Sequence, residues 1–297
     1  MSVTDPTEAN ATLAASGADD EARERRDRLR QIFRSGTFLV GLGIVLFWVF
    51  CAVFGPMIVP YDPYADDLMN ALMPPSAEHW FGTDQLGRDV FSRVIVGARD
   101  ILTIAPLATL ISTILGTALG LAMGYFRGVI DEGISRIVDA LLALPTVIVA
   151  LLALVALGPS SATVVFVIGF TFAPIIARTV RASVLAEREL DYVFAAQLRR
   201  ENAFHIMFVE ILPNVLPPIL VEATVRLGYA IFAVASLSFI GFGIQPPSPD
   251  WGLSISANYG LIGAGYWWTV LFDGSAIATL VVAVNLVADG IQSALDE

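Results

Sequence analysis

The residues that could do chemistry in this chain of 297 residues are few and widely spaced. Its apolar stretches contain the ionisable residues Asp139, Glu222, Arg226 and Asp289. Hydrolytic chemistry requires a matched set, such as paired carboxylates or a nucleophile beside a base. The sequence offers neither arrangement within these stretches, so an intramembrane enzyme is the weaker alternative to a protein without catalysis of its own.

Nucleotide hydrolysis and metal chemistry are disfavoured by composition. All 17 basic residues are arginine, and a phosphate-binding P-loop requires a lysine. His79 and His205 are far apart and Cys51 is the only cysteine, so neither a zinc site nor an intrachain disulfide is expected. The sequence therefore predicts no catalytic residue, no metal site and no cofactor.

Glu222 and Arg226 are the most informative charges in the apolar stretches. They are four residues apart, so on a helix they share one face and can pair. An arginine deep in a membrane costs at least ~2.5 kcal/mol unless it faces protein or water. Either the pair lines an aqueous translocation path, or it only neutralises itself, and the sequence leaves both interpretations open.

A charged insert separates two apolar stretches. It reads DYVFAAQLRRENAFHIMFVEILPN over residues 191–214 and contains the small pair Ala195 and Ala196 beside bulky apolar residues. A helix lying on lipid would need basic residues along its whole polar face, but acidic residues dilute this one. Small residues flanked by charge suit insertion into a groove of another protein. Protein docking is therefore preferred to a solvated loop, by a modest margin.

The overall composition of the chain is that of an integral membrane protein. Hydrophobic residues make up 56% of the chain, charged residues 15%, and mean hydropathy is +0.72. Ordinary soluble domains are about a quarter charged. Six stretches have the length of membrane spans. They are residues 37–59, 101–125, 134–157, 163–180, 213–242 and 274–295.

Small and cyclic residues within the spans indicate a bundle. Gly116, Gly120 and Gly124 recur every four residues, which predicts close approach of another helix rather than a pore lining. Pro106, Pro145 and Pro174 lie inside spans, where neighbouring helices or water must bind the freed backbone groups.

Arginine distribution predicts the orientation of the spans. Thirteen arginines fall in segments that share a side with the N-terminus, against three, Arg88, Arg93 and Arg99, in the other loops. The excess predicts cytoplasmic termini, a cytoplasmic insert, and Tyr266, Trp267 and Trp268 at the outer interface. Residues 1–34 are predicted to form a disordered acidic tail with a short basic helix and no cleavable signal, and residues 35–297 one membrane domain.

The net charge is −11 without any lysine. This halophile-like composition suits a high-salt cytoplasm that screens self-repulsion. A GC-rich coding bias combined with an acidic tail explains it equally well.

Several motifs in colinear order carry a family resemblance over roughly residues 35 to 297. The insert, DYVFAAQLR to ILPN, resembles the EAA loop of ATP-binding-cassette (ABC) importer permeases. The stretches HWFGTDQLGRDVFSRVIVGAR (79–99), GYFRGVIDEGISRIVDALLALP (124–145), LSFIGFGIQPPSPDWG (237–252), YWWTVLFDG (266–274) and NLVADGIQSALD (285–296) are similar to the C-type permease of dipeptide, oligopeptide and nickel importers.

The resemblance implies an all-α integral membrane protein with about six transmembrane helices, a type I ABC importer permease bundle with a cytoplasmic coupling helix at about residues 183–212. It implies contact with the ATPase through Asp191, Ala195, Ala196, Arg200, Pro213 and Asn214. Arg200 replaces the glycine that joins two short helices in the family, so it must adopt φ > 0 with strain unless the turn differs. Glu210 replaces a basic or histidine position.

The same resemblance implies the partners. These are a sister permease subunit in a heterodimer, cytoplasmic ATPase subunits, an extracellular substrate-binding protein and membrane lipid, but no nucleic acid. Asp84, Arg88 and Asp89 are candidates for contact with the binding protein, although a helix cap and local ion pairs explain them better. Peptide is the expected substrate, with nickel, glutathione and short glycans as alternatives. A purely structural subunit would not explain the charged insert.

Overall fold

The computed structural model of the chain describes residues 33 and 35–296, and the predicted N-terminal tail lies outside the described residues except for Phe33. Within that range the regular elements are helices, apart from one isolated bridge between Thr83 and Asp89. Five of them are long and apolar enough to cross a membrane, and a sixth span is possible if one bent pair is counted. The prediction of an all-α protein with about six spans is confirmed.

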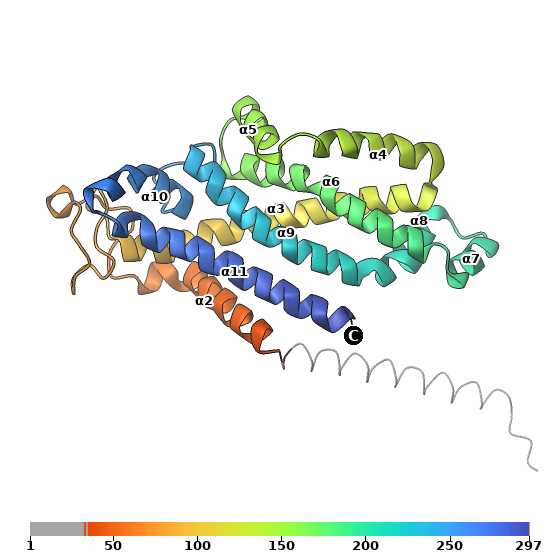
Figure 1. The fold of residues 1–297 in the computed structure, drawn as a ribbon, viewed down its shortest axis with the longest axis horizontal. Helices are drawn as coiled ribbons and strands as arrows, with labels where there is room; N and C mark the ends of the chain where they lie inside the picture. The colour runs from red at the N-terminus through yellow and green to blue at the C-terminus, as the bar shows by residue number, and fades with distance from the viewer. Residues whose placement is uncertain (1–32, 34, 297) are drawn as a thin grey trace, which may run out of the picture.

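Long helices run along an elongated body (Figure 1). They are α2 (Gly36–Ile58), α3 (Val90–Phe126), α6 (Ser161–Glu187), α9 (Leu212–Ile240) and α11 (Trp268–Asp296). Short elements gather at the two ends of the bundle. The α10 end carries η1 (Leu68–Asn70), α10 (Trp251–Asn258) and η3 (Tyr259–Ala264), and the α7 end carries α7 (Asp191–Leu198), α8 (Ala203–His205) and the π-helix η2 (Ile206–Ile211).

The third predicted span, residues 134–157, is not one straight helix. It divides into α4 (Gly128–Leu142) and α5 (Thr146–Leu157), whose axes are bent by 89°. Pro145 precedes α5 and has no backbone N–H, and its ring disfavours a helical Leu144 before it. By contrast, Pro106 and Pro174 are accommodated inside α3 and α6. The sequence signalled the proline but did not predict that only this one would break its helix.

Helices α3 and α6 form the closest pair in the bundle, and the glycine stripe is the reason. A Cβ on Gly116, Gly120 or Gly124 would lie within 2.6, 2.5 and 2.6 Å of side-chain atoms of Ile176, Val180 and Val184 respectively. The contacts advance in the same direction along both helices, so α3 and α6 run parallel. The close approach confirms that the stripe packs against a helix.

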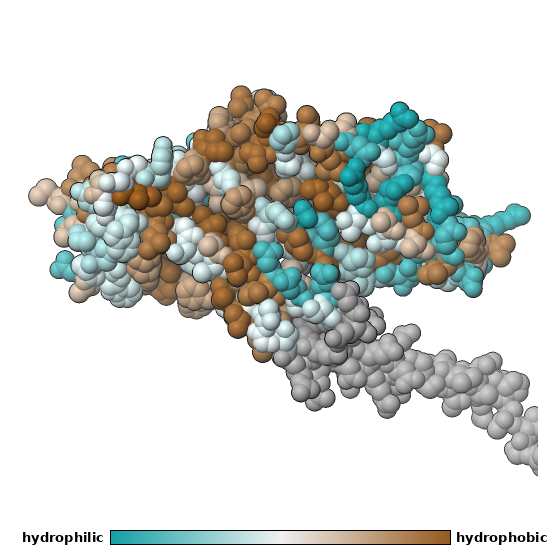
Figure 2. Space-filling model, in the orientation of Figure 1, coloured by the Kyte–Doolittle hydropathy of each residue, from teal (hydrophilic) through white to brown (hydrophobic). Residues whose placement is uncertain are grey.

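Ion pairs fasten α4 to α6 near the α7 end. Arg181 binds Asp131 through two hydrogen bonds of 2.6 and 2.7 Å, and Arg178 pairs with Asp139. Asp139, one of the candidate intramembrane charges, is therefore half of a surface ion pair. Apolar residues cover the middle of the body, whereas hydrophilic residues gather toward the α7 end (Figure 2). An apolar belt around the middle of the body is the surface expected of a bundle that spans a membrane.

Candidate functional site

The segment that follows α6 folds back on the bundle through three local signals. Asp191 opens α7, where its carboxylate is favoured by the helix dipole. Helix α7 ends in a Schellman motif, in which the N–H groups of Arg200 and Glu201 donate to the carbonyls of Gln197 and Ala196. The side chain of Asn202 then caps α8 by accepting from the N–H of His205 at 2.7 Å.

Arg200 occupies the position of this motif that requires a left-handed backbone. Its φ is +59°, which glycine adopts freely and an L side chain adopts with strain. The structure thus answers the alternative posed by the sequence: the turn is kept, and arginine takes the glycine conformation. The guanidinium itself is exposed.

The paired alanines differ in burial, since only one of the two faces the body of the chain. Ala196 has no exposed surface and packs with Val193 against Ile206, Met207 and Ile211. Ala195 is exposed, together with Phe194, Leu198 (84% exposed) and, on α8, Phe204 (70% exposed). The expectation that both alanines face a partner needs correction, because Ala196 belongs to the core of its own chain. We call Phe194, Ala195, Leu198 and Phe204 the apolar face of the α7 segment.

Polar contacts join this segment to the helices on either side. Arg199 pairs with Glu210 at 2.9 Å, so Glu210 serves as an internal partner. The hydroxyl of Tyr192 donates to Glu187 Oε1 at 2.7 Å and accepts from Asn214 Nδ2 at 3.0 Å. Pro213 lies in the first turn of α9, which continues directly from the π-helix η2, so its missing N–H interrupts the backbone hydrogen bonding between these two elements. Tyr192 was not predicted as a functional residue, because its partners are set by tertiary packing.

Glu222 and Arg226 lie together on α9, as their spacing predicts. Arg226 Nε is 2.7 Å from Glu222 Oε1, although the two groups are not aligned as a hydrogen bond. The guanidinium also lies over the ring of Tyr229, 4.6 Å from its centre. Both contacts lower the cost of an arginine among apolar helices.

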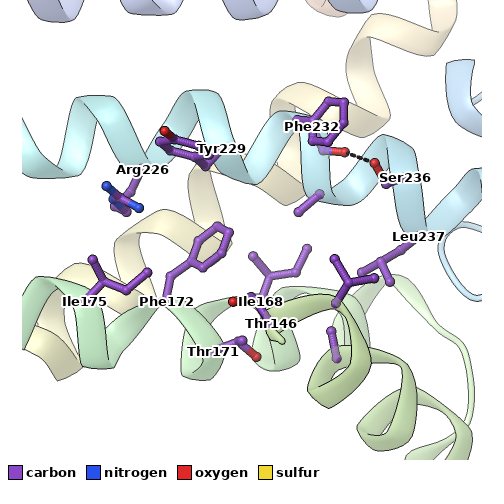
Figure 3. A pocket seen from close by; sticks show the side chains of 13 residues that line it. Thr146, Ile168, Thr171, Phe172, Ile175, Arg226, Tyr229, Phe232, Ser236 and Leu237 are labelled. Atoms are coloured by element: carbon purple, nitrogen blue, oxygen red, sulfur yellow. Dashed lines mark hydrogen bonds between the residues drawn. The ribbon is translucent and has the colours of Figure 1, made fainter. Parts of the chain in front are cut away.

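Arg226 and Tyr229 line a groove between α5, α6 and α9 (Figure 3). The groove has a volume of about 360 Å³ and is mainly apolar, with Phe172 and Phe232 among its walls. Its other polar groups are hydroxyls, from Thr146, Thr171 and Ser236. Glu222 does not line the groove, so Arg226 is the charged side chain that faces it.

The residues proposed for outside contact are largely used within the chain. The Asp84 carboxylate accepts from the N–H groups of Leu86 and Arg88 and from Arg88 Nε, all at 2.8–3.0 Å. Asp89 caps α3 and pairs with His79 at 2.9 Å. Asp84 and Asp89 are 2% and 3% exposed, whereas Arg88 is partly exposed and is the one of these three residues that can contact another protein.

A second buried polar cluster lies nearby at the α10 end. Arg93 donates to the carbonyls of Pro63 and Ser248, tying the loop between α2 and α3 to the loop before α10. Asp250 caps α10 by accepting from Leu253 N at 2.8 Å, and burial raises the pKa of its carboxyl to about 6. Trp268 is also buried and donates to Thr83 O at 3.1 Å, so of the three predicted interface aromatics Trp267 is the more exposed tryptophan. Among residues 35–296, no group of His, Cys, Asp and Glu is arranged to hold a metal ion.

Comparison with known proteins agrees with this architecture. Residues 116–297 match the family described as binding-protein-dependent transport system inner membrane component, and residues 25–75 match the N-terminal TM domain of oligopeptide transport permease C. The dipeptide transport system permease protein DppC of Alkalihalophilus pseudofirmus is 39% identical over 271 residues, covering 91% of this chain and 89% of that protein. The DppC of Escherichia coli K12 is 41% identical over 265 residues, covering 87% and 88%.

A solved structure shares the fold. An inward-facing MetNI methionine ABC transporter matches with a TM-score of 0.57 at 18% identity, over 68% of this chain and 96% of that one. The apolar helical bundle and the folded α7 segment define a multi-pass membrane transport permease. The chain belongs to the family of binding-protein-dependent transport system inner membrane components.

Proposed function

We propose that this chain is one of two permease subunits of a peptide importer, driven by ATPase subunits that bind the apolar face of the α7 segment. The proposal that an ATPase docks here rests on the apolar face of the α7 segment, because this face leaves large apolar side chains exposed beyond the apolar middle of the body (Figure 2). Exposed apolar groups of this kind mark protein contacts. The relatives named as dipeptide permeases support peptide as the substrate class.

Orientation follows from arginine counts. With the α7 end in the cytoplasm, the segment meets soluble ATPase subunits, and both termini lie on the same side. Asp191, Ala195 and Arg200 then face the ATPase, whereas Ala196, Pro213 and Asn214 hold the segment in shape. An extracellular substrate-binding protein meets the α10 end, where Arg88 is the side chain of its trio available for contact.

Docking is tested by a charge placed on the exposed face. Leu198→Asp disturbs no buried packing, since Leu198 is 84% exposed, but it would bury an unpaired charge in the partner's groove at a cost of several kcal/mol. We expect the variant to insert normally and to lose copurification with the ATPase. Met69→Asp is the matched control, at a residue 93% exposed on η1. Equal copurification of Leu198→Asp and wild type would refute the docking surface.

We propose further that the groove of Arg226 is part of the translocation path. A guanidinium bordered by hydroxyls and aromatic rings can bind a peptide carboxylate while the walls accept apolar side chains. Glu222 balances the charge of Arg226 and sets its position. The groove opens at the surface of this subunit, which supports a path shared with a sister permease.

The path is tested by removing both charges. Glu222→Gln combined with Arg226→Leu keeps the pair neutral, so we expect folding to be retained while the rate or range of peptide uptake changes. Glu132→Gln with Arg136→Leu is the control, because Glu132 and Arg136 form an exposed pair of the same spacing on α4. Unchanged transport per folded complex in the first variant would mean that the pair is only structural.

A further inference from the structure

Three elements meet at the hydroxyl of Tyr192. It donates to Glu187, the last residue of α6, and accepts from Asn214 in the first turn of α9, while Tyr192 itself belongs to α7. We infer that Tyr192 is the positioning residue that transmits movement of the α7 segment to both membrane helices. This inference rests on the proposed docking of an ATPase to that segment.

The Tyr192 hydroxyl is suited to this part because it both donates and accepts. Burial, followed by the hydrogen bond to Glu187, raises the pKa of Tyr192 to about 12, so the proton stays in place at neutral pH. Its bond to a carboxylate is of the stronger, charge-assisted kind. Asn214 is held in turn, since its Nδ2 also donates to the carbonyl of Glu210 at 2.9 Å.

The other contacts of α7 are less able to direct a movement. Val193 and Ala196 pack through apolar surface, which is not directional. The ion pair of Arg199 with Glu210 is more than half exposed at the arginine and is screened by salt. The Tyr192 hydroxyl, in contrast, fixes distance and angle to two helices at once.

The connection reaches the groove through α9. At ~1.5 Å per residue, Glu222 lies about 12 Å and Arg226 about 18 Å along the helix from Asn214. Pro217 and Pro218 lie between these positions, yet α9 is one continuous helix through them, so a displacement of its first turn is carried on by one element that can bend at the prolines. A shift of α7 imposed by a bound partner therefore moves the start of α9, and with it the side of the groove that carries Arg226.

Tyr192→Phe removes both hydrogen bonds and keeps the ring. The assay uses the complete complex with its ATPase subunits in lipid nanodiscs, and compares hydrogen exchange of residues 212–225 without nucleotide and after vanadate trapping. We expect wild type to show a difference between the two states. In Tyr192→Phe we expect copurification and ATP hydrolysis to remain while this difference falls about tenfold, the scale of one charge-assisted hydrogen bond.

Tyr259→Phe is the matched control. It removes an exposed tyrosine hydroxyl at the α10 end and should leave the exchange difference unchanged. A wild-type difference preserved in Tyr192→Phe overturns the inference, and so does a wild-type complex that hydrolyses ATP without any change in 212–225. Failure of wild type to bind an ATPase refutes the proposed function instead, so the two failures are distinguishable.

A swap of partners separates transmission from simple packing. Asn214→Asp alone puts two carboxylates around one hydroxyl proton, and we expect it to lose the exchange difference. Adding Glu187→Gln reverses the chain of bonds, because the glutamine amide donates to Tyr192 and Tyr192 donates to the aspartate. The double variant still lacks the donor to the Glu210 carbonyl, so we expect it to regain part of the difference that Asn214→Asp loses. No gain over Asn214→Asp would overturn the inference, even if Tyr192→Phe assembled poorly.

Discussion

Replacing Arg200 with glycine should stabilise the α7 segment. Arg200 holds φ at +59° as the residue after the helix cap, and its N–H and that of Glu201 complete the Schellman motif. A left-handed backbone at a residue with a Cβ costs on the order of 1 kcal/mol, and glycine removes that cost. Glycine also raises the conformational entropy of the unfolded chain, which offsets part of the gain in stability.

The expected net effect is local and measurable. A gain of about 1 kcal/mol corresponds to roughly fivefold slower amide exchange where exchange occurs by local opening. We therefore expect peptides covering residues 190–203 to exchange about threefold to fivefold more slowly in Arg200→Gly, with no change in α3 or α6. Hydrogen exchange measured by mass spectrometry on the detergent-solubilised protein resolves this segment.

Arg200→Ala separates the backbone from the guanidinium. It removes the charge and keeps the Cβ, so the strain should persist and exchange should stay near that of wild type. Equal rates for the alanine and glycine variants would refute the strain argument. Faster exchange in Arg200→Gly would show that the arginine side chain stabilises the turn by more than its backbone costs.

Three other predictions concern packing, protonation and orientation. Gly120→Ala should destabilise the fold by roughly 1–3 kcal/mol, because its Cβ would lie 2.5 Å from Val180 Cβ and 2.8 Å from Ala177 O. Gly133→Ala, on α4 where nothing lies within 4 Å, should not destabilise it. A melting temperature that is lower for Gly133→Ala than for Gly120→Ala would contradict the α3–α6 contact. Asp250→Asn keeps the helix cap but removes a carboxyl group whose pKa, about 6 in the folded protein, exceeds its unfolded value. Ionising this buried carboxyl lowers the free energy of unfolding by roughly 3 kcal/mol; this penalty is full above pH 6 and disappears toward pH 4. The melting-temperature gain of Asp250→Asn should thus be large at pH 7.5 and small at pH 4.5, and a gain independent of pH would exclude the carboxyl as its source. In a Cys51→Ser background, an impermeant thiol reagent on intact cells should label Gly263→Cys and not Gly133→Cys; labelling of position 133 would reverse the proposed orientation.

Local pattern in the sequence was sufficient to predict the spans and the helix contact of the glycine stripe. Hydropathy marks the spans because a bilayer of fixed thickness needs about 20 apolar residues. The four-residue spacing of Gly116, Gly120 and Gly124 indicated a helix contact before its partner was known, since that spacing alone places them on one helix face. Arg200 was singled out by the family resemblance, because it stands where the family has a glycine, and the sequence left open whether the turn is kept.

Only the tertiary structure decided which faces are buried. Ala195 and Ala196 are chemically identical neighbours, yet packing of α7 against η2 buries Ala196 and leaves Ala195 exposed. The sequence favoured a helix cap and local ion pairs for Asp84, Arg88 and Asp89, but only the fold made Asp89 the cap of α3 and brought His79 to it. The Tyr192 hydroxyl meets Glu187 and Asn214 only when α6 and α9 are brought together. Burial and directional contacts depend on segments distant in the chain, whereas spans and turns depend on neighbours within a few residues.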